Sequence, residues 1–181
     1  MFWQGQNSKE RAAFPGSRML RPVRHGAPTT GSHMADSIVM TEHERAAFLR
    51  DVHTGIISIP DGDRGPLAVP IWYRVDDDGD VVVLTPATSR KARLCAVGTR
   101  VSLTAQTEEL PPKYVSVEGP VVSIEPSDVD ELTVMAARYL GDEIGAAYVE
   151  MTRGSDDDVD EVQIRMRPER WFSGDFAKRH G

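Results

Sequence analysis

The sequence has a single cysteine, Cys95, and this excludes two classes of protein. One thiol cannot form an internal disulfide, and it cannot supply a cysteine-based metal cluster. Cys95 stands among Leu94, Ala96 and Val97. This apolar setting favours a buried structural thiol over a nucleophile.

Long hydrophobic runs and an excess of positive charge are also missing. No apolar run approaches the ~20 residues that a membrane-spanning helix needs. The 181 residues carry a formal net charge of −7, which argues against general nucleic-acid or membrane-surface binding. With 40% hydrophobic and 27% charged residues, the composition is that of an ordinary soluble domain. We therefore expect a cytoplasmic protein that binds neither nucleic acid nor membrane.

The first 34 residues differ from the rest, because they carry five basic residues against the single acidic Glu10. They show no sustained periodicity, and Gly31-Ser32-His33-Met34 is tag-like. We predict a disordered or tag-like extension over 1–40, a folded domain over 41–173 and a C-terminal tail over 174–181.

Within the folded part, alternating and β-branched runs outnumber helical patterns. Thr41 and Glu44 form a capping box that starts the first helix. A second helix follows Ser127 as its cap and ends at Gly141, and a short one is expected near 146–151. The strands that we expect are 56–59, 66–75, 81–85, 101–107, 113–124 and 162–166. Six strands joined mostly by short turns favour an antiparallel sheet or small barrel with peripheral helices over a doubly wound fold.

Three local features qualify these strands. Pro70 is tolerated only at an edge or a bulge, so it should interrupt the strand 66–75. The acidic run 76–80 lacks the spacing of a calcium loop and reads as a solvated hairpin turn. Gly119-Pro120 marks a bulge in the strand 113–124.

The run Ser89-Arg90-Lys91-Ala92-Arg93 carries the strongest chemical signal. It follows the strand 81–85 and precedes a short apolar helix at 94–97, so three cations meet the hydroxyls of Thr85, Thr88 and Ser89. Cations at a helix N-terminus oppose the helix dipole, and a bound anion, most commonly phosphate, reverses that penalty. A solvated basic turn paired with nearby carboxylates explains the same residues. The local sequence supports both interpretations.

No catalytic constellation is visible in the chain. We find no Ser-His-Asp or Cys-His arrangement, no metal-ligand spacing, and no Gly-x-Gly-x-x-Gly after a strand. We therefore assign no catalytic side chain and no metal ligand. This suits a reaction in which a cofactor supplies the chemistry and the protein supplies binding and orientation.

The order of these motifs resembles the pyridoxamine 5′-phosphate oxidase-like flavin-binding split barrels, especially the actinobacterial flavin- and deazaflavin (F420)-dependent oxidoreductases. The matching residues are Ser89–Arg93, Arg100–Leu103 and Tyr114–Gly119, within a resemblance over Thr41–Trp171. It implies a mainly β (α+β) fold, a six-stranded antiparallel split β-barrel with peripheral helices. It also implies a homodimer that binds FMN or F420 at its interface.

The resemblance assigns the site residues. Lys91 and Arg93 become phosphate ligands, helped by Ser89 and Thr88. The cofactor ring would rest against the second strand and the end of the third, at Val69, Pro70, Ile71, Trp72, Leu84 and Thr85. F420 has a long anionic tail, which a groove of Arg90, Arg93, Arg100 and Lys113 would suit. Trp72 would stack near the ring or pack in the core or interface, and Glu118 would pair with a cation such as Arg100.

The chain departs from true pyridoxamine phosphate oxidases at its C-terminal end. Those enzymes carry an Arg- and His-containing motif there, whereas here the tail runs Trp171-Phe172-Ser173-Gly174-Asp175-Phe176 and the only late histidine is His180. The implied function is therefore hydride transfer from a reduced flavin or deazaflavin to a small conjugated or aromatic acceptor. The alternative is a non-catalytic carrier or sensor of the same fold that binds the cofactor or haem.

Overall fold

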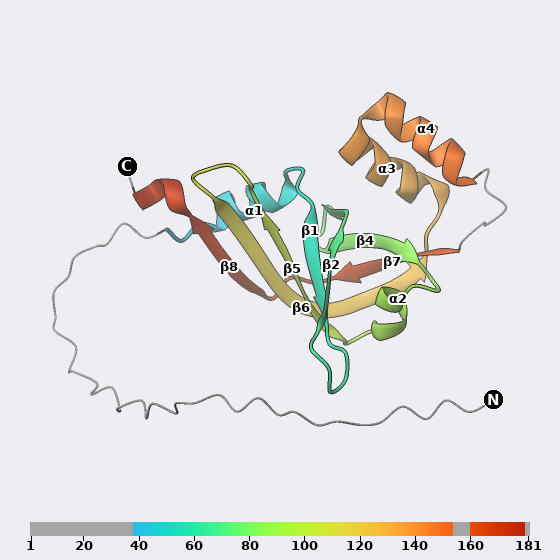
Figure 1. The fold of residues 1–181 in the computed structure, drawn as a ribbon, viewed down its shortest axis with the longest axis horizontal. Helices are drawn as coiled ribbons and strands as arrows, with labels where there is room; N and C mark the ends of the chain where they lie inside the picture. The colour runs from blue at the N-terminus through green and yellow to red at the C-terminus, as the bar shows by residue number, and fades with distance from the viewer. Residues whose placement is uncertain (1–37, 154–159, 180–181) are drawn as a thin grey trace, which may run out of the picture. The chain divides into compact units, whose positions relative to one another are not determined.

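Eight antiparallel strands form one curved sheet in the computed structural model, which describes residues 38–153 and 160–179 (Figure 1). Their order is β2-β1-β5-β6-β7-β4-β3, and β8 also pairs with β6. The strands are β1 Gly55–Ile59, β2 Leu67–Ile71, β3 Tyr73–Val75, β4 Val81–Pro86, β5 Arg100–Gln106, β6 Lys113–Pro126, β7 Glu161–Met166 and β8 Arg170–Asp175. The predicted mainly β split barrel with peripheral helices is confirmed.

The long strand β6 joins the two halves of the barrel. Its first half pairs with β5 and β8, and its second half pairs with β7. Val115 and Val117 from β6 and Leu103 from β5 are fully buried in the main core. This follows from the period-2 alternation of strands, which sends every second side chain inward.

Two strands were not expected from the sequence. The predicted strand 66–75 divides into β2 and β3 at Trp72, not at Pro70. Pro70 lies inside β2, which pairs only with β1, and such an edge strand tolerates proline. The second addition is β8, which continues to Asp175 and so includes the first two residues of the predicted tail.

The helices lie around this sheet. They are α1 Glu42–Arg50, α2 Arg90–Leu94, α3 Val129–Leu140 and α4 Asp142–Arg153, followed by the 3-10 turn η1 Phe176–Arg179. The predicted capping box of α1 is confirmed, with Glu44 N–H donating to Thr41 Oγ1 at 3.3 Å and Thr41 N–H donating to Glu44 at 2.7 Å. No helix in residues 38–153 and 160–179 is long and apolar enough to cross a membrane.

The α3–α4 hairpin covers the outer face of β4 and β7 (Figure 1). Met135, Ala136 and Val149 of the hairpin and Val82 of β4 are buried but do not belong to the main core cluster. The cap of α3 is Asp128, not Ser127 as predicted, because the Asp128 carboxylate accepts the Glu131 N–H at 2.9 Å. The predicted helix at 146–151 is the middle of the longer α4.

The acidic turn between β3 and β4 is not the plain solvated turn that we predicted. Asp80 is 3% exposed, and its carboxylate accepts two hydrogen bonds from Arg167 at 3.1 and 3.2 Å. Asp76 accepts from the Asp80 N–H at 2.9 Å and forms an ion pair with Arg165. The turn is therefore fastened to β7 and the residue that follows it, and only Asp77 and Asp78 point to solvent.

The predicted bulge at Gly119-Pro120 is displaced. The register between β6 and β7 shifts between Val121 and Ser123 instead. Gly119 serves a different purpose, because a Cβ on it would lie 1.7 Å from the carbonyl oxygen of Arg167. The glycine lets the β7–β8 connection cross directly over β6.

Candidate functional site

The basic run forms a short helix of its own. α2 begins at Arg90, four residues before the predicted helix at 94–97. Ser89 is its cap, with Oγ accepting the Ala92 N–H at 3.1 Å. Thr85 is buried near the end of β4, and its hydroxyl forms a hydrogen bond with the Ser89 hydroxyl, with 3.0 Å between the two oxygens. The core strand thus fixes the position of the cap, and through it the position of the three cations.

The three cations of α2 have different surroundings. Arg90 forms an ion pair with Asp61 in the β1–β2 loop, as the basic-turn interpretation expected. Arg93 donates to the backbone carbonyl of Thr88. Lys91 is half-buried, and the described residues give its ammonium group neither an ion pair nor a hydrogen bond. Lys91 is thus the cation that remains available to an anion.

The structure does not assemble the broad cationic groove expected from Arg90, Arg93, Arg100 and Lys113. Arg100 pairs with Glu169 at 2.8 Å, and Lys113 pairs with Asp175 at 2.9 Å. Arg100 also lies opposite Pro120, at the far end of the β5–β6 ladder from Lys113, roughly 20 Å away along the strand. The proposed pairing of Glu118 with Arg100 is wrong, since Glu169 takes that place.

The residues expected near a cofactor ring lie on β2 and at its end. Val69 and Ile71 face the core, and Pro70 is exposed. The Trp72 ring stacks on Tyr139 of α3, with ring centroids 4.8 Å apart and an interplanar angle of 5°. Its side chain is therefore packed within this subunit, and contact of this strand with a ring stays a prediction.

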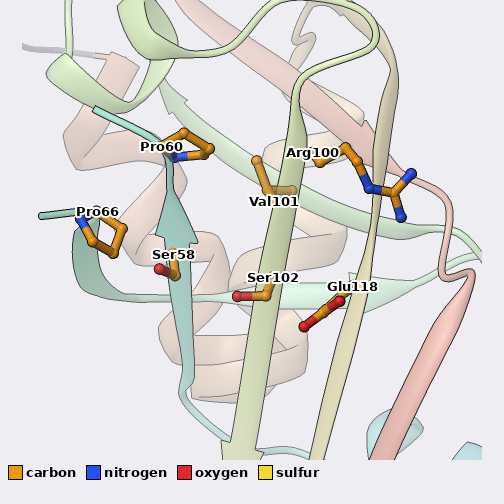
Figure 2. A pocket seen from close by; sticks show the side chains of 7 residues that line it. All are labelled: Ser58, Pro60, Pro66, Arg100, Val101, Ser102 and Glu118. Carbon is orange, nitrogen blue, oxygen red and sulfur yellow. The ribbon is translucent and has the colours of Figure 1, made fainter. Parts of the chain in front are cut away.

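A hollow of about 240 Å³ opens on the outer face of the sheet beside α2 (Figure 2). Ser58, Ser102 and Glu118 line it from neighbouring strands in direct register. Pro60 and Pro66 form the wall at the β1–β2 loop. Asp61, the partner of Arg90, directly follows Pro60, so the ion pair holds α2 next to this hollow.

A second hollow of about 730 Å³ lies on the same outer face. Ile56, Pro70 and Thr104 line it in register, and His53 and Gln106 lie at its rim. Burial lowers the pKa of His53. Its ring stacks on that of Phe48, with the ring centroids 4.2 Å apart. Sequence reasoning missed this outward row of small polar residues, although serine and threonine at alternate strand positions were its visible signal.

These features can be compared with known proteins. The family model described as pyridoxamine 5′-phosphate oxidase matches residues 41–173. The search of curated proteins found no significant match.

Three solved structures illustrate the likeness in fold. The conserved hypothetical protein Rv2991 from Mycobacterium tuberculosis has 26% identity and a TM-score of 0.62, over 80% of this chain and 91% of that one. An F420 reductase has 19% identity and a TM-score of 0.51, over 70% and 94% of the two chains. A FAD-binding protein from Mesorhizobium loti has 16% identity and a TM-score of 0.52, over 75% and 94%. The structure shows the barrel and the capped basic helix, and the family model matches residues 41–173. The chain therefore belongs to the pyridoxamine 5′-phosphate oxidase family.

Proposed function

We propose that this protein is an oxidoreductase that binds FMN or F420 and transfers a hydride to a small conjugated or aromatic acceptor. The observation that supports it best is Lys91, an uncommitted cation on a helix whose cap is fixed by the buried Thr85. Family membership supports the same assignment. An F420 reductase and a FAD-binding protein also share the fold.

The donor set at α2 fits a single phosphate group. The Lys91 ammonium, the Ser89 hydroxyl and the amides of the first turn of α2 offer charge and hydrogen bonds within one turn of chain. Arg93 would join them by leaving the Thr88 carbonyl. Because Arg100 and Lys113 are already paired with carboxylates, this compact set favours the phosphate of FMN over the long anionic tail of F420.

The bound cofactor would supply the hydride chemistry. The protein's own residues would bind and orient it: Lys91 and Ser89 at the phosphate, and the backbone of β2 beside the ring. The acceptor would be held by shape and apolar contact, so the function needs no catalytic side chain.

We propose a second copy of the chain as the partner that completes the site. A register row crosses five strands on the outer face, through Pro70, Ile56, Thr104, Ser116 and Phe172. Ile56 and Phe172 are 41% and 52% exposed, although both are large and apolar. The two hollows open on this same face, so a second copy would bury Ile56 and Phe172 and close both hollows.

The test is titration of the purified protein with FMN, F420 and FAD, followed by cofactor fluorescence. Replacing Lys91 and Arg93 together with alanine should weaken binding about 10- to 1,000-fold, since each charge-assisted bond contributes ~1.5–3 kcal/mol and the two are not additive. Lys91→Ala alone should account for most of this loss. Arg179→Ala is the matched control, because that exposed arginine contacts only Phe176 among the described residues.

The outcomes separate the candidates. Unchanged affinity in a folded Lys91/Arg93 double variant would remove α2 from the site. Tight binding without cofactor-dependent turnover across a broad acceptor panel would favour the non-catalytic carrier. No binding of any of the three cofactors would defeat the oxidoreductase and direct the search to haem.

A further inference from the structure

A third cavity lies away from α2, between the α3–α4 hairpin and the barrel. Its volume is about 160 Å³. Its lining residues are Trp72, Leu84, Leu132, Met135, Tyr148 and Glu161. Leu84 faces this cavity, whereas the next residue, Thr85, bonds to the Ser89 cap of α2. Successive strand residues point to opposite faces, so the cavity and the basic helix lie on opposite faces of β4.

Among the described residues that line the cavity, Glu161 is the one that carries a charge. It is half-buried at the start of β7, and the described residues supply no ion pair or hydrogen bond to its carboxylate. Burial raises its pKa. Three arginines whose side chains the structure describes in this region have other partners: Arg74 pairs with Glu131, Arg165 pairs with Asp76, and Arg138 donates to the carbonyls of Tyr73 and Asp51.

Two aromatic rings, those of Trp72 and Tyr148, also line the cavity. The Trp72 and Tyr148 centroids are 5.9 Å apart, and the rings are tilted by 54°. Tyr139 stacks on Trp72 at 4.8 Å and holds the indole in place. Leu132 and Met135 complete an apolar lining. The π faces of Trp and Tyr attract cations, most strongly where the cation is withdrawn from water.

We propose that this cavity binds a small alkylammonium cation, such as a trimethylammonium group. An anion would be repelled by Glu161, and a neutral apolar ligand would leave that carboxylate without a partner. A methylated ammonium satisfies the carboxylate, the aromatic faces and the apolar wall together. The site does not depend on the proposed cofactor, because it uses the other face of β4.

Choline and its uncharged isostere 3,3-dimethylbutan-1-ol test this directly, since they share shape and differ in charge. Isothermal titration should show choline binding at neutral pH and the isostere binding at least about tenfold more weakly. Glu161→Gln should weaken choline binding about tenfold or more, a loss that converts to ~1.4 kcal/mol. Glu150→Gln is the matched control, because it removes an exposed carboxylate of α4 that pairs with no group among the described residues.

Tyr148→Leu provides a second variant that keeps apolar bulk and removes one π face, in case Glu161→Gln does not fold. It should also weaken choline binding and leave binding of the isostere nearly unchanged. Equal affinity for choline and the isostere, or no choline binding by the folded protein at millimolar concentration, would overturn the proposal. Cofactor titration of the same variants should be unaffected, so failure here is distinguishable from failure of the proposed oxidoreductase.

Discussion

At the residue scale, one hydroxyl of α3 joins three segments. Tyr139 Oη accepts the Tyr73 N–H at 2.9 Å and donates to the carbonyl of His53 at 2.8 Å. Tyr73 is the first residue of β3, and His53 lies just before β1. By contrast, the hydroxyl of the fully buried Tyr73 has no hydrogen-bond partner among the described residues.

We therefore expect Tyr139→Phe to destabilise the protein by about 1–3 kcal/mol, since it leaves a buried N–H and a carbonyl without their partner. Tyr148→Phe is the matched control, because that ring also contacts Trp72 and its hydroxyl forms no hydrogen bond within the described residues. Tyr73→Phe should be neutral or stabilising. Denaturant unfolding of the three variants measures this, and equal losses for Tyr139→Phe and Tyr148→Phe would contradict it.

At the element scale, the crossing of β6 by the β7–β8 connection depends on Gly119. The Arg167 carbonyl lies so close that any Cβ at this position collides with backbone, which cannot move aside as a flexible side chain can. In the same connection, the Arg167 N–H donates to the Pro120 carbonyl at 3.0 Å, and the Glu169 N–H donates to the Glu118 carbonyl at 2.8 Å. Hydrogen bonds to the residues before and after Gly119 therefore hold the connection close to β6.

Gly119→Ala should cost more than about 3 kcal/mol or prevent folding, because it forces this crossing apart. Gly65→Ala is the comparison, since a Cβ there meets nothing within 4 Å and its backbone is not in the left-handed region. Thermal unfolding of both variants gives the result. A Gly119→Ala protein as stable as the Gly65→Ala protein would show that the crossing is looser than described.

At the scale of the whole molecule, the two ends of the described domain meet. Asp175 N–H donates to the Ile38 carbonyl at 2.7 Å, and the Lys178 ammonium contacts Glu44 at 2.6 Å. The hydrogen bond from Lys178, followed by those from Thr41, lowers the pKa of Glu44 from 4.5 to about 2. A carboxyl pKa lowered by folding stabilises the folded state above the unfolded value, and this contribution is lost as pH falls toward the folded value.

The stability due to this contact should therefore be complete above about pH 4.5 and disappear as pH falls to about 2. Lys178→Gln should lower the unfolding temperature slightly at pH 7 and flatten its decline across that acid range. Thermal scans from pH 7 to pH 2 check this. Parallel curves for the two proteins would mean that the acid sensitivity arises elsewhere.

The proposed dimer is also a property of the whole molecule. Phe172→Lys places a charge in the register row through Ile56 and Phe172 and should convert a dimer to a monomer, measured by size-exclusion chromatography with light scattering. Ile144→Lys is the control, because that residue is 63% exposed on α4, outside the row. A wild-type protein that is already monomeric at high concentration would reject the interface outright.

The strands show which part of the fold the sequence predicts correctly. Val101, Leu103 and Ala105 alternate with polar neighbours, and all three are buried, because strand periodicity is local information. The cap of α1 was likewise readable, since Thr41 and Glu44 lie one turn apart. The position of the basic run after a strand was correct too, but its helix begins at Arg90 because Ser89 caps it and Asp61 offsets the first cation.

The rest was decided by residues far apart in the chain. Trp72 breaks its strand to stack on Tyr139, and Gly119 faces the carbonyl of Arg167. Arg100 takes Glu169 as its partner, not Glu118. The sequence by itself determined the alternation, the cap of α1 and the family, because these depend on neighbouring residues. Only the tertiary structure decided which cation stays available and where the cavities open, because burial and pairing depend on contacts between distant segments.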